Sequence, residues 1–192
     1  MKRLFVCLVL FNLAACNNQN DKMNPNSGFK HAPLAKSVNS PAFNASFNFI
    51  LNAYFDLNNG FIAEKDSGIA QSARALMIAA DSLKLNELKA DSNLINTAKS
   101  YSEGISAELK GLLGETEMLA KRRSFQMISD QLYDLVRTVQ YDQKMLFHFY
   151  CPTAFDDQGA YWISDKSNIL NPYLPKKIPV CRDIRDTIQF VH

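Results

Sequence analysis

Apolar residues recur at helical spacing through the middle of the chain, from residue 43 to residue 139. A separation of three or four positions places these side chains on one face of a helix. Four such stripes follow one another, and Asp66 and Asp91 stand between them as candidate helix caps. The stripes consist of Phe47, Ile50, Leu51, Tyr54, Leu57 and Phe61; Ile69, Ala73, Leu76, Ala80 and Leu83; Leu94, Ala98, Tyr101, Ile105, Leu109 and Leu112; and Phe125, Ile128, Leu132, Leu135 and Val139. Because short connections make neighbouring helices antiparallel, the pattern predicts an up-down four-helix bundle.

The pattern changes after Gln140, where side chains begin to alternate as they do in β-strands. Residues 145–151 alternate in this way and predict one strand, and residues 160–164 predict the return strand. Between them, residues 156–159 read Asp-Asp-Gln-Gly, which favours a turn. A segment punctuated by prolines then leads to Cys181. We therefore expect a mainly α fold, an antiparallel up-down four-helix bundle with a small C-terminal β-hairpin and an irregular loop.

The first 16 residues have the organisation of a bacterial lipoprotein signal. Lys2 and Arg3 precede an apolar run at residues 4–13, interrupted only by Asn12. This run is shorter than the roughly 20 residues that a membrane-spanning helix needs, and it suits a signal peptide. It ends in Leu-Ala-Ala-Cys, which resembles a lipobox and predicts lipidation at Cys16. The alternative is a plain secretory signal with an incidental cysteine.

Three segments follow from this organisation. Residues 1–15 are the predicted signal peptide, and residues 16–42 are the lipidated cysteine and a flexible polar tether rich in Asn and Pro. Residues 43–192 form a single helical domain with the C-terminal hairpin. Asn17 follows the anchor cysteine, where an Asp would favour the inner membrane. We therefore expect a protein anchored to the membrane by lipid, in the cell envelope and at the outer membrane, facing the periplasm.

Composition excludes some classes of function without naming one. The formal charge of +2 is too small for an electrostatic nucleic-acid binder, and it falls to zero once Lys2 and Arg3 are removed with the signal. No histidine lies between His31 and His148, so the helices cannot supply the histidines of a di-iron site. The sequence has no glycine-rich phosphate loop, Cys-x-x-Cys or Gly-x-Ser-x-Gly motif. We expect neither an enzyme nor a nucleic-acid partner.

The C-terminal segment carries the most distinctive motifs of the chain. They are Cys-Pro-Thr-Ala at residues 151–154, Gly-Ala-Tyr-Trp-Ile-Ser at 159–164, Asn-Pro-Tyr at 171–173, and Cys181. With this spacing the segment resembles a family of helical domains of unknown function. Its members occur as stand-alone exported proteins of Gram-negative bacteria and as appendages of periplasmic adaptors of copper/silver efflux pumps. The resemblance implies a role linked to heavy-metal efflux, with a component of a metal efflux system as partner and Cu(I) as a candidate ligand.

The resemblance implies that members of this family carry a set of soft ligands, two cysteines and two methionines. Such a set suits Cu(I). The chain keeps Cys151 and Cys181 but has Thr153 and Ile178 where the family has methionine. His148 and Met145 are the remaining candidate metal ligands near Cys151.

A disulfide between Cys151 and Cys181 is the alternative, because paired cysteines in an oxidising compartment usually bridge. Closing a loop of this length would stabilise the fold by about 3–4 kcal/mol.

Two functions from different classes therefore remain open. The first is a lipoprotein facing the periplasm that binds Cu(I) or a similar soft metal in support of efflux. The second is a non-enzymatic interaction module of the envelope whose two cysteines form a structural disulfide. A surface patch of Tyr150, Phe155, Tyr161 and Tyr173 would help to distinguish them.

Overall fold

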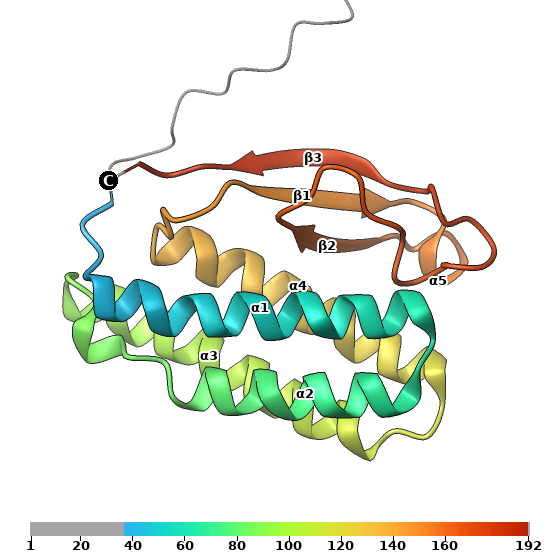
Figure 1. Ribbon diagram of the computed structural model, residues 1–192, viewed down its shortest axis with the longest axis horizontal. Helices are drawn as coiled ribbons and strands as arrows, with labels where there is room; N and C mark the ends of the chain where they lie inside the picture. The colour runs from blue at the N-terminus through green and yellow to red at the C-terminus, as the bar shows by residue number, and fades with distance from the viewer. Residues whose placement is uncertain (1–36, 192) are drawn as a thin grey trace, which may run out of the picture. The chain divides into compact units, whose positions relative to one another are not determined.

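Four long helices make up just over half of residues 37–191, the part of the chain that the computed structural model describes (Figure 1). The predicted signal peptide, Cys16 and most of the predicted tether lie outside the described residues. The helices are α1 (Pro41–Ala63), α2 (Asp66–Asp81), α3 (Ser92–Gly114) and α4 (Met118–Thr138), with a short 3₁₀ turn, η1 (Leu85–Glu87), before α3. The predicted mainly α class is therefore confirmed. No helix within residues 37–191 has the length and apolar content needed to cross a membrane.

Local chemistry explains where the helices begin. The Ser40 hydroxyl accepts a hydrogen bond from the Phe43 N–H at 3.1 Å and caps α1, and Pro41 occupies the first turn. Asp91 caps α3 as predicted, since its carboxylate accepts from the first amides of that helix at 2.9 and 3.0 Å. Asp66, in contrast, is the first residue of α2, and Lys65 precedes it without a capping side chain.

The predicted apolar stripes form the core between the helices. Apart from Leu94 and Tyr101, which are half-buried, the residues of all four stripes are buried. Each helix packs against the next along the chain. Tyr54 of α1 also reaches α4, where its hydroxyl lies 2.8 Å from that of Ser129 and its ring is stacked on that of Phe125.

A three-stranded antiparallel sheet follows the helices, with strand order β2-β1-β3. The strands are β1 (Leu146–Cys151), β2 (Ala160–Ser164) and β3 (Asp183–Ile188), and β2 packs against α4. The predicted hairpin is confirmed, because β1 and β2 pair in a register that sets Phe149 opposite Trp162. The third strand was not predicted. Its first half is charged and exposed, so it lacks the alternation that marks a half-buried strand.

The folded part begins earlier than the predicted boundary at residue 43. Ser37 and Asn39 are buried, and α1 already starts at Pro41. The side-chain amide of Asn39 donates to the Val139 carbonyl at 2.8 Å, and the Ser37 N–H donates to the Val191 carbonyl at 2.5 Å. The polar composition of this segment predicted a tether. Its polar groups instead form hydrogen bonds with backbone carbonyls, one just after α4 and one near the C-terminus.

Candidate interaction site

A disulfide joins Cys151 to Cys181, as the second of the two sequence interpretations predicted. Cys151 is the buried last residue of β1, and Cys181 is half-buried just ahead of β3. The Thr153 hydroxyl lies 3.3 Å from the Cys151 sulfur and 3.4 Å from the Cys181 sulfur. The bond therefore ties the end of one strand to the start of its neighbour and closes the segment between them.

The other two predicted metal ligands lie in different surroundings. The His148 ring is held between the rings of Tyr133 and Tyr161, with centroid distances of 3.8 and 4.8 Å. Burial lowers the pKa of His148 to about 4, so its imidazole is neutral near pH 7. Met145 lies in the connection before β1 and is 42% exposed.

The four predicted metal ligands do not form one donor set in this structure. Within residues 37–191 there is no group of three or more His, Cys, Asp or Glu side chains that could hold a metal ion. The sulfurs of Cys151 and Cys181 are bonded to each other, so neither is a free thiolate for a soft metal. Cu(I) does not fit this arrangement unless the disulfide is first reduced.

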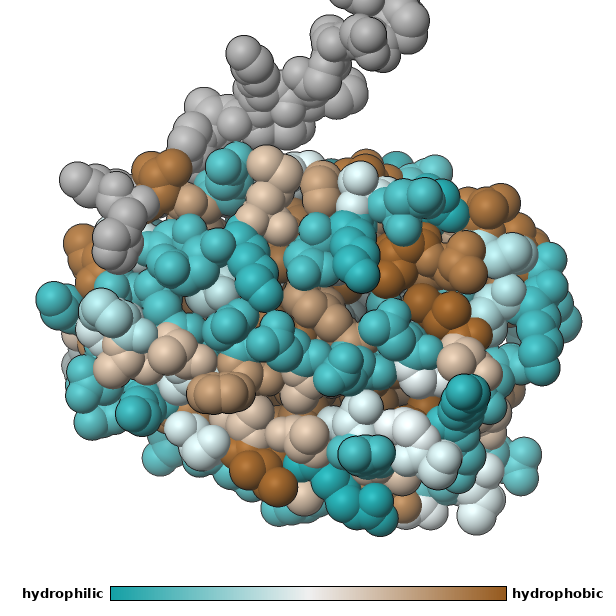
Figure 2. Space-filling view, in the orientation of Figure 1, coloured by the Kyte–Doolittle hydropathy of each residue, from teal (hydrophilic) through white to brown (hydrophobic). Residues whose placement is uncertain are grey.

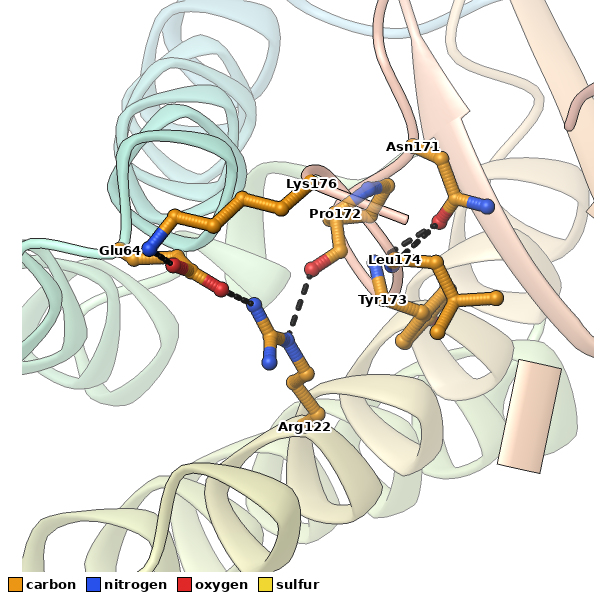
Figure 3. Close-up of polar contacts among 7 residues, drawn as sticks. All are labelled: Glu64, Arg122, Asn171, Pro172, Tyr173, Leu174 and Lys176. Carbon is orange, nitrogen blue, oxygen red and sulfur yellow. Dashed lines mark hydrogen bonds and ion pairs between the residues drawn. The ribbon is translucent and has the colours of Figure 1, made fainter. Parts of the chain in front are cut away.

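Asn171 organises the loop that the disulfide closes (Figure 3). Its side chain is fully buried, and its Oδ1 accepts from the N–H groups of Tyr173 at 2.8 Å and Leu174 at 3.2 Å. Its Nδ2 donates to the Cys181 carbonyl at 3.0 Å. The prolines predicted a loop here, but the bond from Nδ2 depends on a residue ten positions away.

An ion-pair cluster fixes the same loop to the helices. Arg122 of α4 donates from Nε to the Pro172 carbonyl at 3.0 Å and from Nη2 to Glu64 Oε1 at 2.9 Å. Lys176 pairs with the other carboxylate oxygen of Glu64, at the end of α1 (Figure 3). Hydrogen bonds from Lys176 and Arg122 lower the pKa of the Glu64 carboxyl. One carboxylate therefore holds two cations and links α1, α4 and the loop.

The turn between β1 and β2 has an uncommon backbone. Phe155, Asp156 and Asp157 have φ values of 55°, 56° and 66°, so three successive non-glycine residues lie in the left-handed region. Each such residue costs about 1–2 kcal/mol, and strain of this kind concentrates at functional sites. The Gly159 N–H closes the turn on the Ala154 carbonyl at 2.9 Å. The sequence predicted a turn here but not its handedness.

A groove opens between this turn, the loop and the start of α4. Its cavity measures about 580 Å³, within the range of pockets that hold small ligands or side chains. At its rim, Leu119 is 57% exposed and Ile178 is 41% exposed. Figure 2 shows apolar side chains, in brown, gathered on the right of the molecule beside hydrophilic ones. The groove is lined by Glu64, Leu119, Arg122, Thr153, Phe155, Asp156, Tyr173, Leu174, Pro175, Lys176, Lys177 and Ile178.

The four aromatic residues singled out in the sequence do not form one exposed patch. Phe155 and Tyr173 are buried, and both line the groove. Tyr150 and Tyr161 are half-buried, with ring centroids 4.5 Å apart. They extend the stack that holds His148. Two of the aromatic residues therefore line the groove and two lie on the sheet, and the Tyr173 hydroxyl joins the pairs by donating to the Tyr161 carbonyl at 2.5 Å.

Residues 50–144 match a family model described as "Protein of unknown function (DUF3347)". The DUF3347 match begins within α1 and ends just before β1, and it supports a domain-of-unknown-function family. Both cysteines and the 171–181 loop follow its end. No curated protein and no solved structure matches the chain.

Proposed function

We propose that the chain is a non-enzymatic interaction module of the cell envelope, in which the Cys151–Cys181 disulfide is structural. The observation that supports this most strongly is the groove beside a loop closed by that disulfide. Its walls come from α1, α4, the left-handed turn and the loop, which hydrogen bonds and ion pairs hold in place. A binding surface that is already rigid loses less entropy when a partner docks.

The location in the envelope is part of the proposal. The charged start, the short apolar run and the small residues before Cys16 support export and lipid anchoring. Asn17 supports placement at the outer membrane, facing the periplasm. A disulfide suits this compartment, because disulfides persist in oxidising environments.

We also propose that the four helices form an antiparallel up-down bundle. Two of their three connections are short, and each helix packs against the next. The contact between Tyr54 of α1 and Ser129 of α4 supports a closed arrangement of the four. Such a bundle would provide a rigid base for the loop and the sheet.

The competing function is binding of Cu(I) or a similar soft metal by a component of an efflux system. It rests on the family that the C-terminal motifs resemble. It requires reduction of the disulfide, and the ring of His148 is already engaged in a stack with Tyr133 and Tyr161. The geometry therefore favours the interaction module.

Photo-cross-linking in living cells tests the interaction module. A photoreactive residue is placed at Ile178 in the groove and, as a control, at Ile78, which is exposed on α2. We expect one defined adduct with an exported envelope protein from position 178 and none from position 78. The adduct should be lost when Cys151→Ser opens the loop. Equal labelling from both positions, or labelling from neither, would contradict the proposal.

A further inference from the structure

We propose that the groove binds an extended segment of a partner protein in which acidic residues alternate with aliphatic ones. This inference rests on the proposed interaction module and names the chemistry of its ligand. It follows from the apolar residues, the charges and the shape of the groove.

Apolar side chains from three separate elements meet at the groove. Leu119 comes from the first turn of α4, Phe155 from the left-handed turn and Ile178 from the loop. Leu119 and Ile178 are both exposed, at 57% and 41%. Exposed aliphatic side chains around a concave site are typical of a surface that binds a partner. We therefore expect the ligand to contact Leu119 and Ile178 with aliphatic side chains of its own.

The charges of the groove favour an acidic ligand. Arg122, Lys176 and Lys177 line it, against the carboxylates of Glu64 and Asp156. Glu64 already shows how a carboxylate is held here, since Arg122 and Lys176 both bind it. Lys177 is exposed and forms no ion pair within residues 37–191. Its ammonium group is therefore free to pair with a carboxylate of the ligand.

The shape of the groove favours a peptide over a membrane surface. A cavity of about 580 Å³ can enclose a few side chains, whereas a lipid surface would meet a convex or flat face. The wall at Phe155 is supported from behind, since the Arg123 guanidinium lies 4.8 Å from the centre of its ring. The disulfide closes the loop on one side of this opening, and the left-handed turn forms the other side.

Fluorescence anisotropy with defined peptides tests the ligand class on the purified full chain. Three labelled eight-residue peptides are compared, in which Asp alternates with Leu, Asp with Ser, or Lys with Leu. We expect the Asp-Leu peptide to bind at least tenfold more tightly than the other two. Lys177→Glu and Leu119→Glu should each weaken its binding about tenfold. Lys89→Glu is the matched control, since Lys89 is exposed and adjoins η1 beyond the opposite end of α1.

Three results would overturn the proposal. The peptides could bind equally well, the Asp-Leu peptide could fail to bind, or the substitutions at positions 177 and 119 could leave its binding unchanged. A chain with Cys16→Ser is also tested against vesicles of phosphatidylglycerol and phosphatidylethanolamine. Binding to these vesicles that depends on Lys177, without peptide binding, would assign the groove to lipid instead. If cross-linking at Ile178 succeeds while the peptides fail, the interaction module stands and the ligand class is wrong.

Discussion

The side-chain amide of Asn171 donates to the backbone carbonyl of Cys181 at 3.0 Å, so the loop is closed twice at the same residue. The disulfide to Cys151 is the covalent closure, and the hydrogen bond sets the path of the chain before it. The same side chain accepts from two further amides of the loop. The loop that forms one wall of the groove is therefore closed by one buried polar residue and one covalent bond.

Asn171→Ala should lower the free energy of unfolding by about 2–4 kcal/mol, because it leaves two N–H groups and one carbonyl of the loop without their partner. Urea unfolding of the purified chain measures this. Asn171→Asp is the informative companion: it keeps the acceptor, but it loses the donor and places a carboxylate against the Cys181 carbonyl in a fully buried site. It should therefore cost at least as much as Asn171→Ala at pH 7. A clearly smaller loss in Asn171→Asp would show that the site is open to water and that the bond to Cys181 contributes little.

Removing the disulfide should lower the free energy of unfolding by about 3–4 kcal/mol, the value expected for a loop of this length. The double variant Cys151→Ala, Cys181→Ala and the reduced natural chain should behave alike in thermal melts. A double variant as stable as the oxidised chain would mean that the loop is held by Asn171 and Arg122 alone.

Two glycine substitutions form a matched pair. Gly159 has a φ of +81°, and a Cβ there would meet the Tyr150 ring, so Gly159→Ala should destabilise the fold by about 1–3 kcal/mol. Gly111 lies inside α3, where an added Cβ meets nothing within 4 Å. Gly111→Ala should therefore stabilise by about 0.5–1 kcal/mol. Chemical denaturation of both variants checks the pair, and a shift in the same direction for both would refute the account of the turn.

His148 should make the protein less stable as the pH falls from about 6.5 toward 4. Burial lowers the pKa of its imidazole to about 4, while the Asp186 carboxylate opposes and the Arg137 guanidinium assists this shift. The unfolded chain therefore binds more protons in this interval, and the free energy of unfolding rises with pH. His148→Phe should flatten that part of the profile. A profile left unchanged by His148→Phe would show that the ring is not shielded from water.

Asp130 should act in the opposite direction between about pH 4 and pH 6. Burial, with a smaller contribution from the charge of Asp134, raises the pKa of its carboxyl to about 6. The folded state then binds more protons than the unfolded state, so this group lowers the free energy of unfolding as the pH rises. Asp130→Asn should therefore stabilise the protein at pH 7 and have little effect near pH 4. Unfolding curves at both pH values measure this. The same increase in the free energy of unfolding at pH 4 and pH 7 would contradict the raised pKa of Asp130.

The sequence was informative wherever one periodic signal decided the structure. The helices followed from their apolar stripes, and the β1–β2 hairpin followed from the alternation around Phe149 and Trp162. It was uninformative where structure depends on distant partners. β3 is a charged strand that forms against β1, and Asn39 is buried because Val139 accepts its hydrogen bond.

The candidate site, too, could be predicted from the sequence only in part. The pairing of Cys151 with Cys181 could be predicted as one alternative from cysteine count and compartment. The stack of His148 with Tyr133 and Tyr161 could not be predicted, because both of these rings come from other elements, α4 and β2. The groove combines residues from positions 64 to 178, and no local motif joins them. The left-handed turn that forms one wall could not be predicted either, because none of its three residues with positive φ is a glycine.

The most direct test of the central claim is the intact mass of the full chain, isolated without reductant. The mass is measured before and after anaerobic exposure to Cu(I). A structural disulfide predicts a mass lower than that of the reduced chain by two hydrogen atoms, and no metal adduct. A chain of full mass that takes up one Cu(I), and loses it with Cys151→Ser, would contradict the account and make the cysteines metal ligands.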